Sequence, residues 1–262
     1  LIQNCGNEGD IQGGNYVGGI LGYTQDNTRL ESCYNTGAIS GDTSVGGLVG
    51  YMANNSRIAG SKNTANVTGT QYVGGIAGQL YSGGRIEGCT NNGTIGNMST
   101  TASYVGGIVG YASGTTSRYN FIHNCENNGN IVVTGSYAGG ITSYAYCTNI
   151  KRAVNTANFT ASSSYAYVGG IVAHLAEYST IDRSHNAGAI SCTGDYHGGL
   201  TGYTYGTSNS NYYGQAYNTI YNSYNTGIIA GTNYVGGLVG SISGYTYVHN
   251  DYNMGTVAAG SY

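Results

Sequence analysis

Paired glycines return at near-regular intervals along the chain, and this repeat constrains the fold more than any other feature. Successive pairs are separated by 28, 28, 32, 33, 30, 29 and 38 residues, so the basic unit is 28 residues long. The pairs are Gly18-Gly19, Gly46-Gly47, Gly74-Gly75, Gly106-Gly107, Gly139-Gly140, Gly169-Gly170, Gly198-Gly199 and Gly236-Gly237. Self-similarity at such a period is typical of solenoids and other repeat arrays. We therefore expect a stack of equivalent units.

Four further positions repeat in the same register. An aliphatic residue stands five positions before an invariant asparagine, an apolar residue stands four positions after it, and another follows each glycine pair, as Ile58, Val67 and Ile76 do around Asn63. The asparagine occurs in all nine repeats, at Asn7, Asn35, Asn63, Asn91, Asn127, Asn155, Asn186, Asn225 and Asn253. Each repeat thus supplies three inward-pointing apolar anchors.

The composition of the segments between these anchors predicts strands. Glycine and β-branched residues dominate, and no apolar spacing of three and four residues is sustained, so helices are disfavoured. Three short strands per repeat cannot bury an inner face alone, but stacked coils can. We therefore predict an all-β fold, a parallel β-solenoid of about nine coils that runs through residues 1–262 as one domain. Coils about 4.8 Å apart would span roughly 43 Å, and the crossover rule favours a right-handed path.

The repeated polar and glycine positions have a structural interpretation. A stacked asparagine at a corner can donate and accept along the array and satisfy the backbone groups of the turn. The glycine pairs are expected at tight bends, where a larger side chain would crowd the chain. Because these pairs recur eight times without a strand-to-helix context, they are architectural and do not form a phosphate loop.

The repeats resemble the GLUG motif of bacterial cell-surface proteins, which include streptococcal-type IgA peptidases and adhesin-like proteins. The resemblance is carried by YVGGILGY at residues 16–23, SVGGLVGY at 44–51, YVGGLVG at 234–240 and CYNTGAISG at 33–41, and it extends over essentially the whole chain. It implies a secreted or wall-anchored bacterial protein in which the repeats form a non-catalytic region beside other domains. The zinc-binding HExxH pattern of the peptidases is absent from this sequence.

The register also suggests that the sequence is a piece of a longer array. Leu1 stands just before an inward aliphatic position, and Tyr262 aligns with Tyr16, Tyr72 and Tyr234. A solenoid without caps would expose unpaired backbone groups at its open coils. We therefore expect further repeats or domains in the same parent chain, and end-to-end self-association stays open as an alternative.

Tyrosines form two columns beside the glycine pairs. The first holds Tyr16, Tyr72, Tyr104, Tyr137, Tyr167, Tyr196, Tyr234 and Tyr262 and is broken at Ser44; the second holds Tyr23, Tyr51, Tyr111, Tyr144 and Tyr203 and is broken at Gln79, His174 and Ser241. Stacked rings would stabilise neighbouring coils by about 0.5–1.5 kcal/mol per pair. An exposed aromatic track could instead bind glycans or a partner protein, with Tyr16, Tyr72 and Tyr104 in the site.

Insertions lengthen the repeat at residues 97–102, 113–119 and 204–217. The last is the longest and reads TYGTSNSNYYGQAY, a composition suited to adaptable recognition. It places Tyr205, Tyr212 and Tyr213 beside Tyr203 as candidate ligand-binding residues. The alternative is a surface loop whose extra length costs little closure entropy.

Four cysteines share one register position, two residues before the asparagine. Adjacent coils would allow disulfides between Cys5 and Cys33 and between Cys89 and Cys125, and a stack of reduced thiols is the alternative. No CxxC or Cys/His spacing indicates zinc, so we expect neither a metal nor a cofactor.

Charged residues are scarce, at 7% of the chain, and the formal net charge is −3. No basic stripe exists for phosphates or anionic lipids, and no apolar run could cross a bilayer, which disfavours nucleic-acid binding and membrane insertion.

Three arginines, Arg29, Arg57 and Arg85, stack in one register. They either bind an anionic glycan or are solvated partners of Glu31 and Glu87. Those two acids stand two turns apart, which does not suggest a catalytic pair. The histidines are scattered, and the sequence gives His123 and His249, which share an outward position, no neighbours.

These features together predict the non-catalytic repeat region of a secreted or cell-surface bacterial protein, acting as a rigid stalk and adhesive surface. Host proteins or glycans are the expected partners. Two alternatives remain, a carbohydrate-binding module that uses the tyrosine columns and a self-assembling extracellular fibre subunit.

Overall fold

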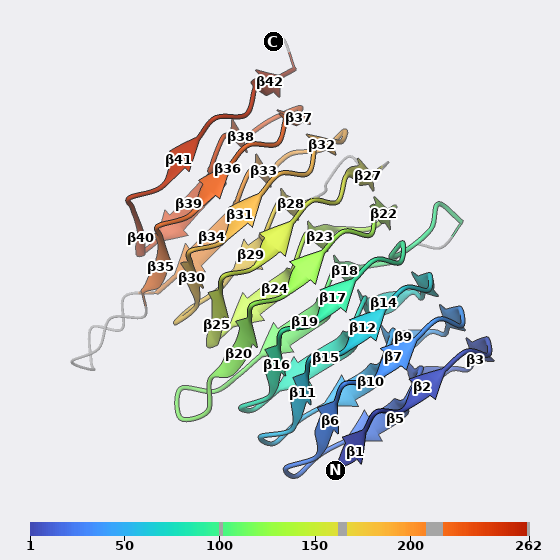
Figure 1. Cartoon of the computed structure of the whole chain (residues 1–262). Coiled ribbons are helices and arrows are strands. Elements are labelled where there is room, and N and C mark those ends of the chain that lie inside the picture. Colours follow the sequence, from blue (N-terminus) through green and yellow to red (C-terminus); the bar gives the residue numbers. More distant parts are fainter. Residues whose placement is uncertain (100–101, 162–166, 208–216, 261–262) are drawn as a thin grey trace.

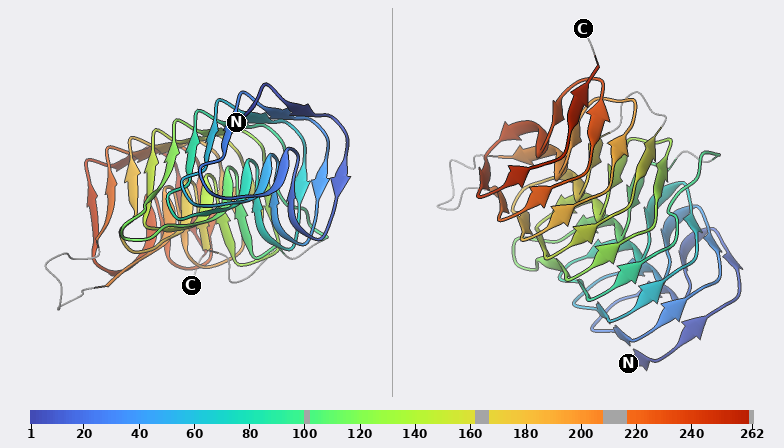
Figure 2. Two further views of the ribbon diagram at one scale, coloured as in Figure 1. Left: turned by 90° about the horizontal axis from the view of Figure 1, so that it is seen from below. Right: turned by 45° about the horizontal axis from the view of Figure 1, so that its top comes forward.

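The computed structural model describes residues 1–99, 102–161, 167–207 and 217–260, and its regular elements in these ranges are all strands. The strands pair in parallel with equivalent strands of neighbouring coils, so the chain winds as a solenoid (Figure 1). The two views in Figure 2 show the coils stacked one on another from the N-terminal to the C-terminal end. The predicted all-β parallel solenoid is confirmed. Across these ranges we find no helix of the length and apolarity needed to span a membrane.

Each coil passes in turn through five sheets, which we call A to E. Sheet A holds β1 (Ile2–Gln3), β6 (Arg29–Glu31), β11 (Arg57–Ala59), β16 (Arg85–Glu87), β20 (Asn120–His123), β25 (Thr148–Lys151), β30 (Thr180–Asp182), β35 (Asn218–Tyr221) and β40 (Thr246–His249). Sheet B holds β2 (Gly6–Asn7), β7 (Tyr34–Asn35), β12 (Lys62–Asn63), β17 (Thr90–Asn91), β21 (Glu126–Asn127), β26 (Val154–Asn155), β31 (His185–Asn186), β36 (Tyr224–Asn225) and β41 (Tyr252–Asn253).

Sheet C is formed by two groups of strands joined through single bridges at Ile95. The first group is β3 (Ile11–Gln12), β8 (Ile39–Ser40) and β13 (Val67–Thr68), and the second is β22 (Ile131–Val133), β27 (Phe159–Ala161), β32 (Ile190–Ser191), β37 (Ile229–Gly231) and β42 (Val257–Ala259).

Sheets D and E flank the glycine pairs. Sheet D holds β4 (Asn15–Gly18), β9 (Thr43–Gly46), β14 (Gln71–Gly74), β18 (Tyr104–Gly106), β23 (Tyr137–Gly139), β28 (Tyr167–Gly169), β33 (His197–Gly198) and β38 (Val235–Gly236). Sheet E holds β5 (Leu21–Thr24), β10 (Val49–Met52), β15 (Ala77–Tyr81), β19 (Val109–Ser113), β24 (Thr142–Tyr146), β29 (Val172–Leu175), β34 (Thr201–Gly206) and β39 (Val239–Gly244).

The expectation of three strands per coil was wrong, because the structure has five. The asparagine and the apolar residue four positions later lie in separate strands, such as β7 and β8, with a turn between them. The segment around each glycine pair is also divided, since the chain bends at the pair and begins a new strand two residues later, as from β9 to β10. Short strands of this kind show only one inward residue each, which hides the boundaries from a search for alternating patterns.

The repeat register of the sequence is also the pairing register of the sheets. Ile58 pairs with Leu30 and Ile86 in sheet A, and Asn63 pairs with Asn35 and Asn91 in sheet B. The insertions at 113–119 and 204–217 both belong to the connection from sheet E to sheet A, in the coils that precede β20 and β35. Most of the 204–217 insertion, including Tyr212 and Tyr213, lies outside the described residues.

The buried apolar side chains form two separate columns inside the solenoid. Residues such as Leu48, Ile58 and Met52 form the column behind sheets A and E, whereas Ile39 and Val45 belong to the column behind sheets C and D. The chain turns inward where sheet D meets sheet E, and the glycine pair stands at this corner. Figure 1 shows sheet E running behind sheet B.

Missing side chains make this corner possible. A Cβ at Gly46 would overlap the carbonyl oxygen of Val49, and a Cβ at Gly47 would lie 2.5 Å from Cγ of Asn63. The first glycine therefore lets two backbone segments touch, and the second lets the corner reach the asparagine column. Glycine is needed here for close approach.

The asparagine column is buried between the two apolar columns and forms a continuous hydrogen-bond ladder. Each side-chain Nδ2 donates to Oδ1 of the next asparagine at 2.7–2.9 Å, from Asn7 to Asn253. The same Nδ2 also donates to the carbonyl oxygen two residues later, as Asn91 does to Gly93 at 2.9 Å. The asparagines lie in the strands of sheet B, and each amide joins two coils while it satisfies the following turn.

The cysteines of the shared register position are thiols in the structure. Cys33, Cys89 and Cys125 are buried, Cys5 is exposed, and none of these four forms a disulfide. Serines take the same place in other coils; for example, the backbone N–H of Cys33 donates to Oγ of Ser61 at 3.0 Å. The position thus holds small side chains, and where it is a serine the hydroxyl accepts a hydrogen bond from the preceding coil, whereas Ala153 fills the same place without one. Burial raises the pKa of the Cys125 thiol, which keeps it protonated at neutral pH.

Candidate functional site

Tyrosine rings on the outer faces of sheets D and E contact each other, and we call the surface that they form the tyrosine corner. On sheet D the rings stack continuously, with centroids 5.2, 4.8, 5.0, 4.6 and 4.6 Å apart, through Tyr72, Tyr104, Tyr137, Tyr167, Tyr196 and Tyr234. On sheet E, Tyr23 stacks on Tyr51 at 4.9 Å and Tyr111 on Tyr144 at 4.7 Å. Two tyrosine ladders therefore run along the solenoid axis.

The two ladders also contact each other edge to face. Tyr16 meets Tyr23 at 5.6 Å, Tyr104 meets Tyr111 at 5.5 Å, and Tyr203 meets Tyr196 at 5.8 Å. Stacking within a ladder and edge contacts between ladders occupy most ring faces, so the ladders present ring edges and hydroxyls outward. This packing suits coil-to-coil stabilisation better than the stacking of sugar rings on open aromatic faces.

The two breaks near the N-terminal end of the ladders lie against each other. Ser44, in sheet D, donates from Oγ to Oε1 of Gln79, in sheet E, at 2.7 Å. Tyr81 lies two residues beyond Gln79 and stacks on Tyr51 at 5.4 Å, which restores an aromatic contact along sheet E. Ser44 and Gln79, which stand where most coils have tyrosine, therefore replace a ring contact between the two ladders with a hydrogen bond.

Burial controls the protonation of these rings. It raises the pKa of Tyr104 and Tyr137, and neighbouring tyrosines add to the effect. His174, which replaces a tyrosine of sheet E, has its pKa lowered to about 4 by burial and lies 5.1 Å from Tyr144 and 5.0 Å from Tyr203. At neutral pH the tyrosine corner is therefore uncharged along these positions.

The candidate ligand-binding tyrosines are only partly brought together. Tyr16, Tyr72, Tyr104 and Tyr203 belong to the tyrosine corner and pack on other rings. Tyr205 lies in β34 with an exposed side chain.

The outer face of sheet A carries the charged residues that the sequence places in one register. Arg57 lies between two acids, with its guanidinium 3.5 Å from Glu31 and 2.7 Å from Glu87. Arg85 covers one face of the Phe121 ring, with Cζ 4.2 Å from the ring centroid. Glu31 and Glu87 are thus held by a cation between them, which is a poor arrangement for acid and base catalysis on a bound glycoside.

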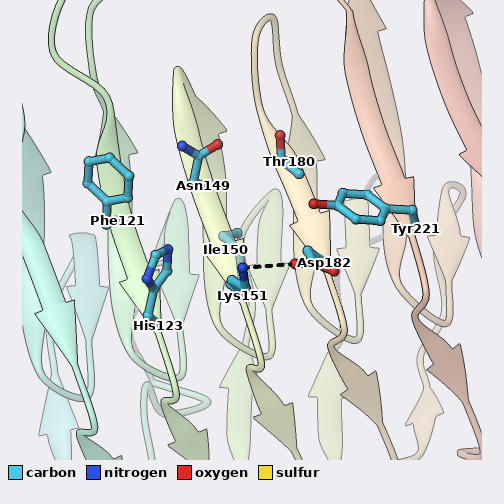
Figure 3. A pocket seen from close by; sticks show the side chains of 8 residues that line it. All are labelled: Phe121, His123, Asn149, Ile150, Lys151, Thr180, Asp182 and Tyr221. Carbon is cyan, nitrogen blue, oxygen red and sulfur yellow. Dashed lines mark ion pairs between the residues drawn. The ribbon is translucent and has the colours of Figure 1, made fainter.

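The same face contains a trough over coils five to eight that the sequence did not indicate. It has a volume of about 300 Å³ and is lined by Phe121, His123, Asn149, Ile150, Lys151, Thr180, Asp182 and Tyr221. Figure 3 shows Phe121 at one end, Tyr221 at the other, and the shorter side chains of Asn149 and Thr180 between them. The register explains the hollow, because large rings at the ends flank two coils with smaller outward residues.

Asp182 is the electrostatic centre of this trough. Its side chain is 3% exposed and accepts hydrogen bonds from Nε and Nη2 of Arg183 at 3.0 and 2.7 Å, while Nζ of Lys151 lies 3.4 Å away. Burial acts to raise the pKa of Asp182, but the two cations outweigh it and the pKa lies below its usual value. The carboxylate is therefore charged at neutral pH and neutralised by two cations.

Two histidines of the sheet A face, His123 and His249, have aromatic neighbours. The expectation that His123 and His249 lack neighbours was wrong: His123 packs edge-on against Phe121 at 5.4 Å, and His249 stacks on Tyr221 at 5.4 Å. The sequence did contain a signal for this row. If the residue after the inward aliphatic position is compared from coil to coil, the row contains His123, Lys151, Asp182 and Tyr221.

In the parts of the chain that the structure describes, no group of three or more His, Cys, Asp or Glu side chains could hold a metal ion.

Comparison with known proteins agrees with the repeat register. Residues 13–40, 41–68 and 69–96 each match the GLUG motif, so the chain carries three tandem GLUG motifs. The resemblance to this motif is confirmed for residues 13–96. No curated protein and no solved structure matches the chain.

Proposed function

We propose that this chain is a non-catalytic repeat region of a secreted or cell-surface bacterial protein, where it acts as a rigid stalk and an adhesive surface. The observation that carries the proposal is the unbroken asparagine ladder, which ties all nine coils together from Asn7 to Asn253. Together with the tyrosine ladders it supports a rod whose coils resist separation. The GLUG motifs at residues 13–96 support a structural repeat protein.

The stalk role predicts resistance to pulling along the axis. In single-molecule force spectroscopy on the chain held at its two ends, we expect discrete unfolding events whose lengths correspond to whole coils. Smooth extension at forces that merely straighten a flexible polymer would contradict the stalk role.

The adhesive role predicts retention of the folded chain on host surfaces. Beads coated with the chain should be retained on mammalian cell layers more strongly than beads coated with the urea-unfolded chain. Equal retention of the two kinds of bead would contradict adhesion. Antibody labelling of intact source cells, compared with permeabilised cells, tests the surface location.

Covered ring faces make the tyrosine ladders a weak candidate for carbohydrate binding by stacking. The trough on sheet A is the better candidate for a binding site, because it is concave and combines aromatic with polar side chains.

A further inference from the structure

The trough on sheet A has the size and lining of a small-ligand subsite. Its volume of about 300 Å³ lies at the lower end of the range of ligand pockets. The row that contains Phe121 continues with Asn149, Thr180 and Thr219 in successive coils. Coils about 4.8 Å apart place the coil of Tyr221 roughly 14 Å from that of Phe121, enough for two sugar rings.

Both aromatic ends of the trough have one ring face that is already covered from outside. Arg85, from the preceding coil, lies over Phe121, and His249, from the following coil, stacks on Tyr221 with an interplanar angle of 10°. The rest of the Phe121 side chain lines the trough beside Asn149. Figure 3 shows the Tyr221 hydroxyl pointing toward Thr180 and Asp182. The trough thus has an apolar wall at one end and a phenol at the other.

Two side chains between these ends retain their hydrogen-bonding capacity. Asn149 and Thr180 are half-buried and line the trough, and within the described ranges their side-chain polar atoms have no hydrogen-bond partner in the protein. Partly buried polar groups in a concave site that lack protein partners are available to a ligand. Lys151 adds an ammonium whose contact with Asp182 uses only part of its three donors.

The charge around the trough is positive although the chain as a whole is negative. Arg85, Lys151, Arg152 and Arg183 give four positive charges against two negative charges from Glu87 and Asp182, an excess of two on a chain with a formal net charge of −3. His123 lies within reach of these charges. Burial is the main cause of its lowered pKa; among the charges, Glu87 raises the pKa, and Lys151, Arg85 and Arg152 lower it.

We infer that this trough binds a carboxylate-bearing sugar of an acidic glycan, with the carboxylate on Lys151 and the apolar sugar face on Phe121. Asn149 and Thr180 are placed to bond the sugar's hydroxyl or amide groups, whereas Asp182 holds Lys151 and Arg183 in position. The inference rests on the adhesive part of the proposed function and assigns it a site and a ligand class.

The test compares acidic and neutral oligosaccharides on the whole chain. A hyaluronan hexasaccharide and a tetramer of sialic acid are the acidic probes, and a hexamer of N-acetylglucosamine is the neutral one; binding is measured by calorimetry at low salt. Because hydrogen bonds to charged groups are strong, we expect at least one acidic probe to bind about tenfold more tightly than the neutral probe. Its affinity should fall as salt is raised.

Two matched variants locate the site. Lys151→Gln should weaken the acidic probe about tenfold, whereas Arg29→Gln, which removes a positive charge from the same sheet outside the trough, should change the affinity less than about twofold. Asp182 keeps its bonds to Arg183 in Lys151→Gln, so the fold should persist, as far-UV circular dichroism can verify.

Three results would overturn the inference: no binding of either acidic probe, equal affinity for acidic and neutral probes, or an unchanged affinity in Lys151→Gln. If one of these results is obtained but the coated beads still adhere to cells, the adhesive function is supported and its binding site lies elsewhere on the chain. Loss of bead adhesion would count against the adhesive function itself.

Discussion

Replacing Asn127 with alanine tests whether the asparagine ladder stabilises the solenoid. Asn127 is fully buried in the middle of the array, accepts from Nδ2 of Asn91 at 2.8 Å, and donates to Oδ1 of Asn155 at 2.9 Å and to the carbonyl oxygen of Gly129 at 3.2 Å. Asn127→Ala removes all three hydrogen bonds. Asn155 Oδ1 and the Gly129 carbonyl then lose the donor that they have in the native protein.

The magnitude follows from the three buried groups that lose a partner, since Nδ2 of Asn91 also loses its acceptor. A buried polar group left without a partner costs about 1–3 kcal/mol, so we expect Asn127→Ala to lower the free energy of unfolding by at least about 3 kcal/mol. The matched control is Asn128→Ala. Asn128 is the next residue and also bonds across coils, to Asn92 and Thr156, but it is exposed to water. Water can replace those bonds, so the control should cost less than about 1 kcal/mol.

Urea denaturation measures both variants. The chain has 28 tyrosines and no tryptophan, so tyrosine fluorescence reports the loss of the ladders, and far-UV circular dichroism reports the strands. Because repeat arrays can unfold in parts, the two signals should be compared and the m-value checked against that of the native chain. A difference of less than about 1 kcal/mol between Asn127→Ala and Asn128→Ala would refute the reasoning.

Three further predictions concern the corner, the buried histidines and the thiols. Gly107→Ala should destabilise the chain by about 3 kcal/mol or more in urea, because its Cβ would overlap the asparagine ladder, whereas Gly9→Ala, with no atom near its Cβ, should be tolerated. Burial lowers the pKa of His197 from its ordinary value of 6.5 and that of His174 to about 4, so the unfolded chain binds more protons and stability should fall as the pH drops from about 6.5 to 4. Thermal melts should show this loss reduced in His197→Val, and an undiminished loss would contradict it. A thiol reagent should modify Cys5 rapidly and the five buried cysteines only after unfolding; slow modification of Cys5 would indicate a disulfide.

The inward-facing positions made the fold predictable from sequence. Ile58, Asn63, Val67 and the Gly74-Gly75 pair have counterparts in the other coils, and the structure pairs these counterparts in register. The number of strands per coil was not predictable in this way, because a two-residue strand such as β12 contains too few positions to show alternation. Strand boundaries depend on backbone hydrogen bonds, which cannot be inferred from the pattern of apolar residues.

The candidate site was less predictable because its residues differ from coil to coil. Phe121, Asn149 and Thr180 occupy equivalent positions but share neither size nor polarity, so they do not form a recognisable motif. Their importance appears only when the coils are superposed, because the hollow results from small side chains placed between large ones. The tyrosine columns were visible in the sequence, but their mutual covering depends on the angle between sheets D and E.

The glycine pair and the asparagine, which the sequence presents as separate repeats, form one interaction in the structure. The second glycine of each pair contacts the asparagine of the neighbouring coil, as Gly107 does with Asn127, so a larger residue at one position would displace the other. This mutual requirement explains why neither position drifts along the array while the outer face of sheet A varies freely. A solenoid of this kind keeps its interior fixed and alters its outer rows independently, and the trough between Phe121 and Tyr221 is a local result of that freedom.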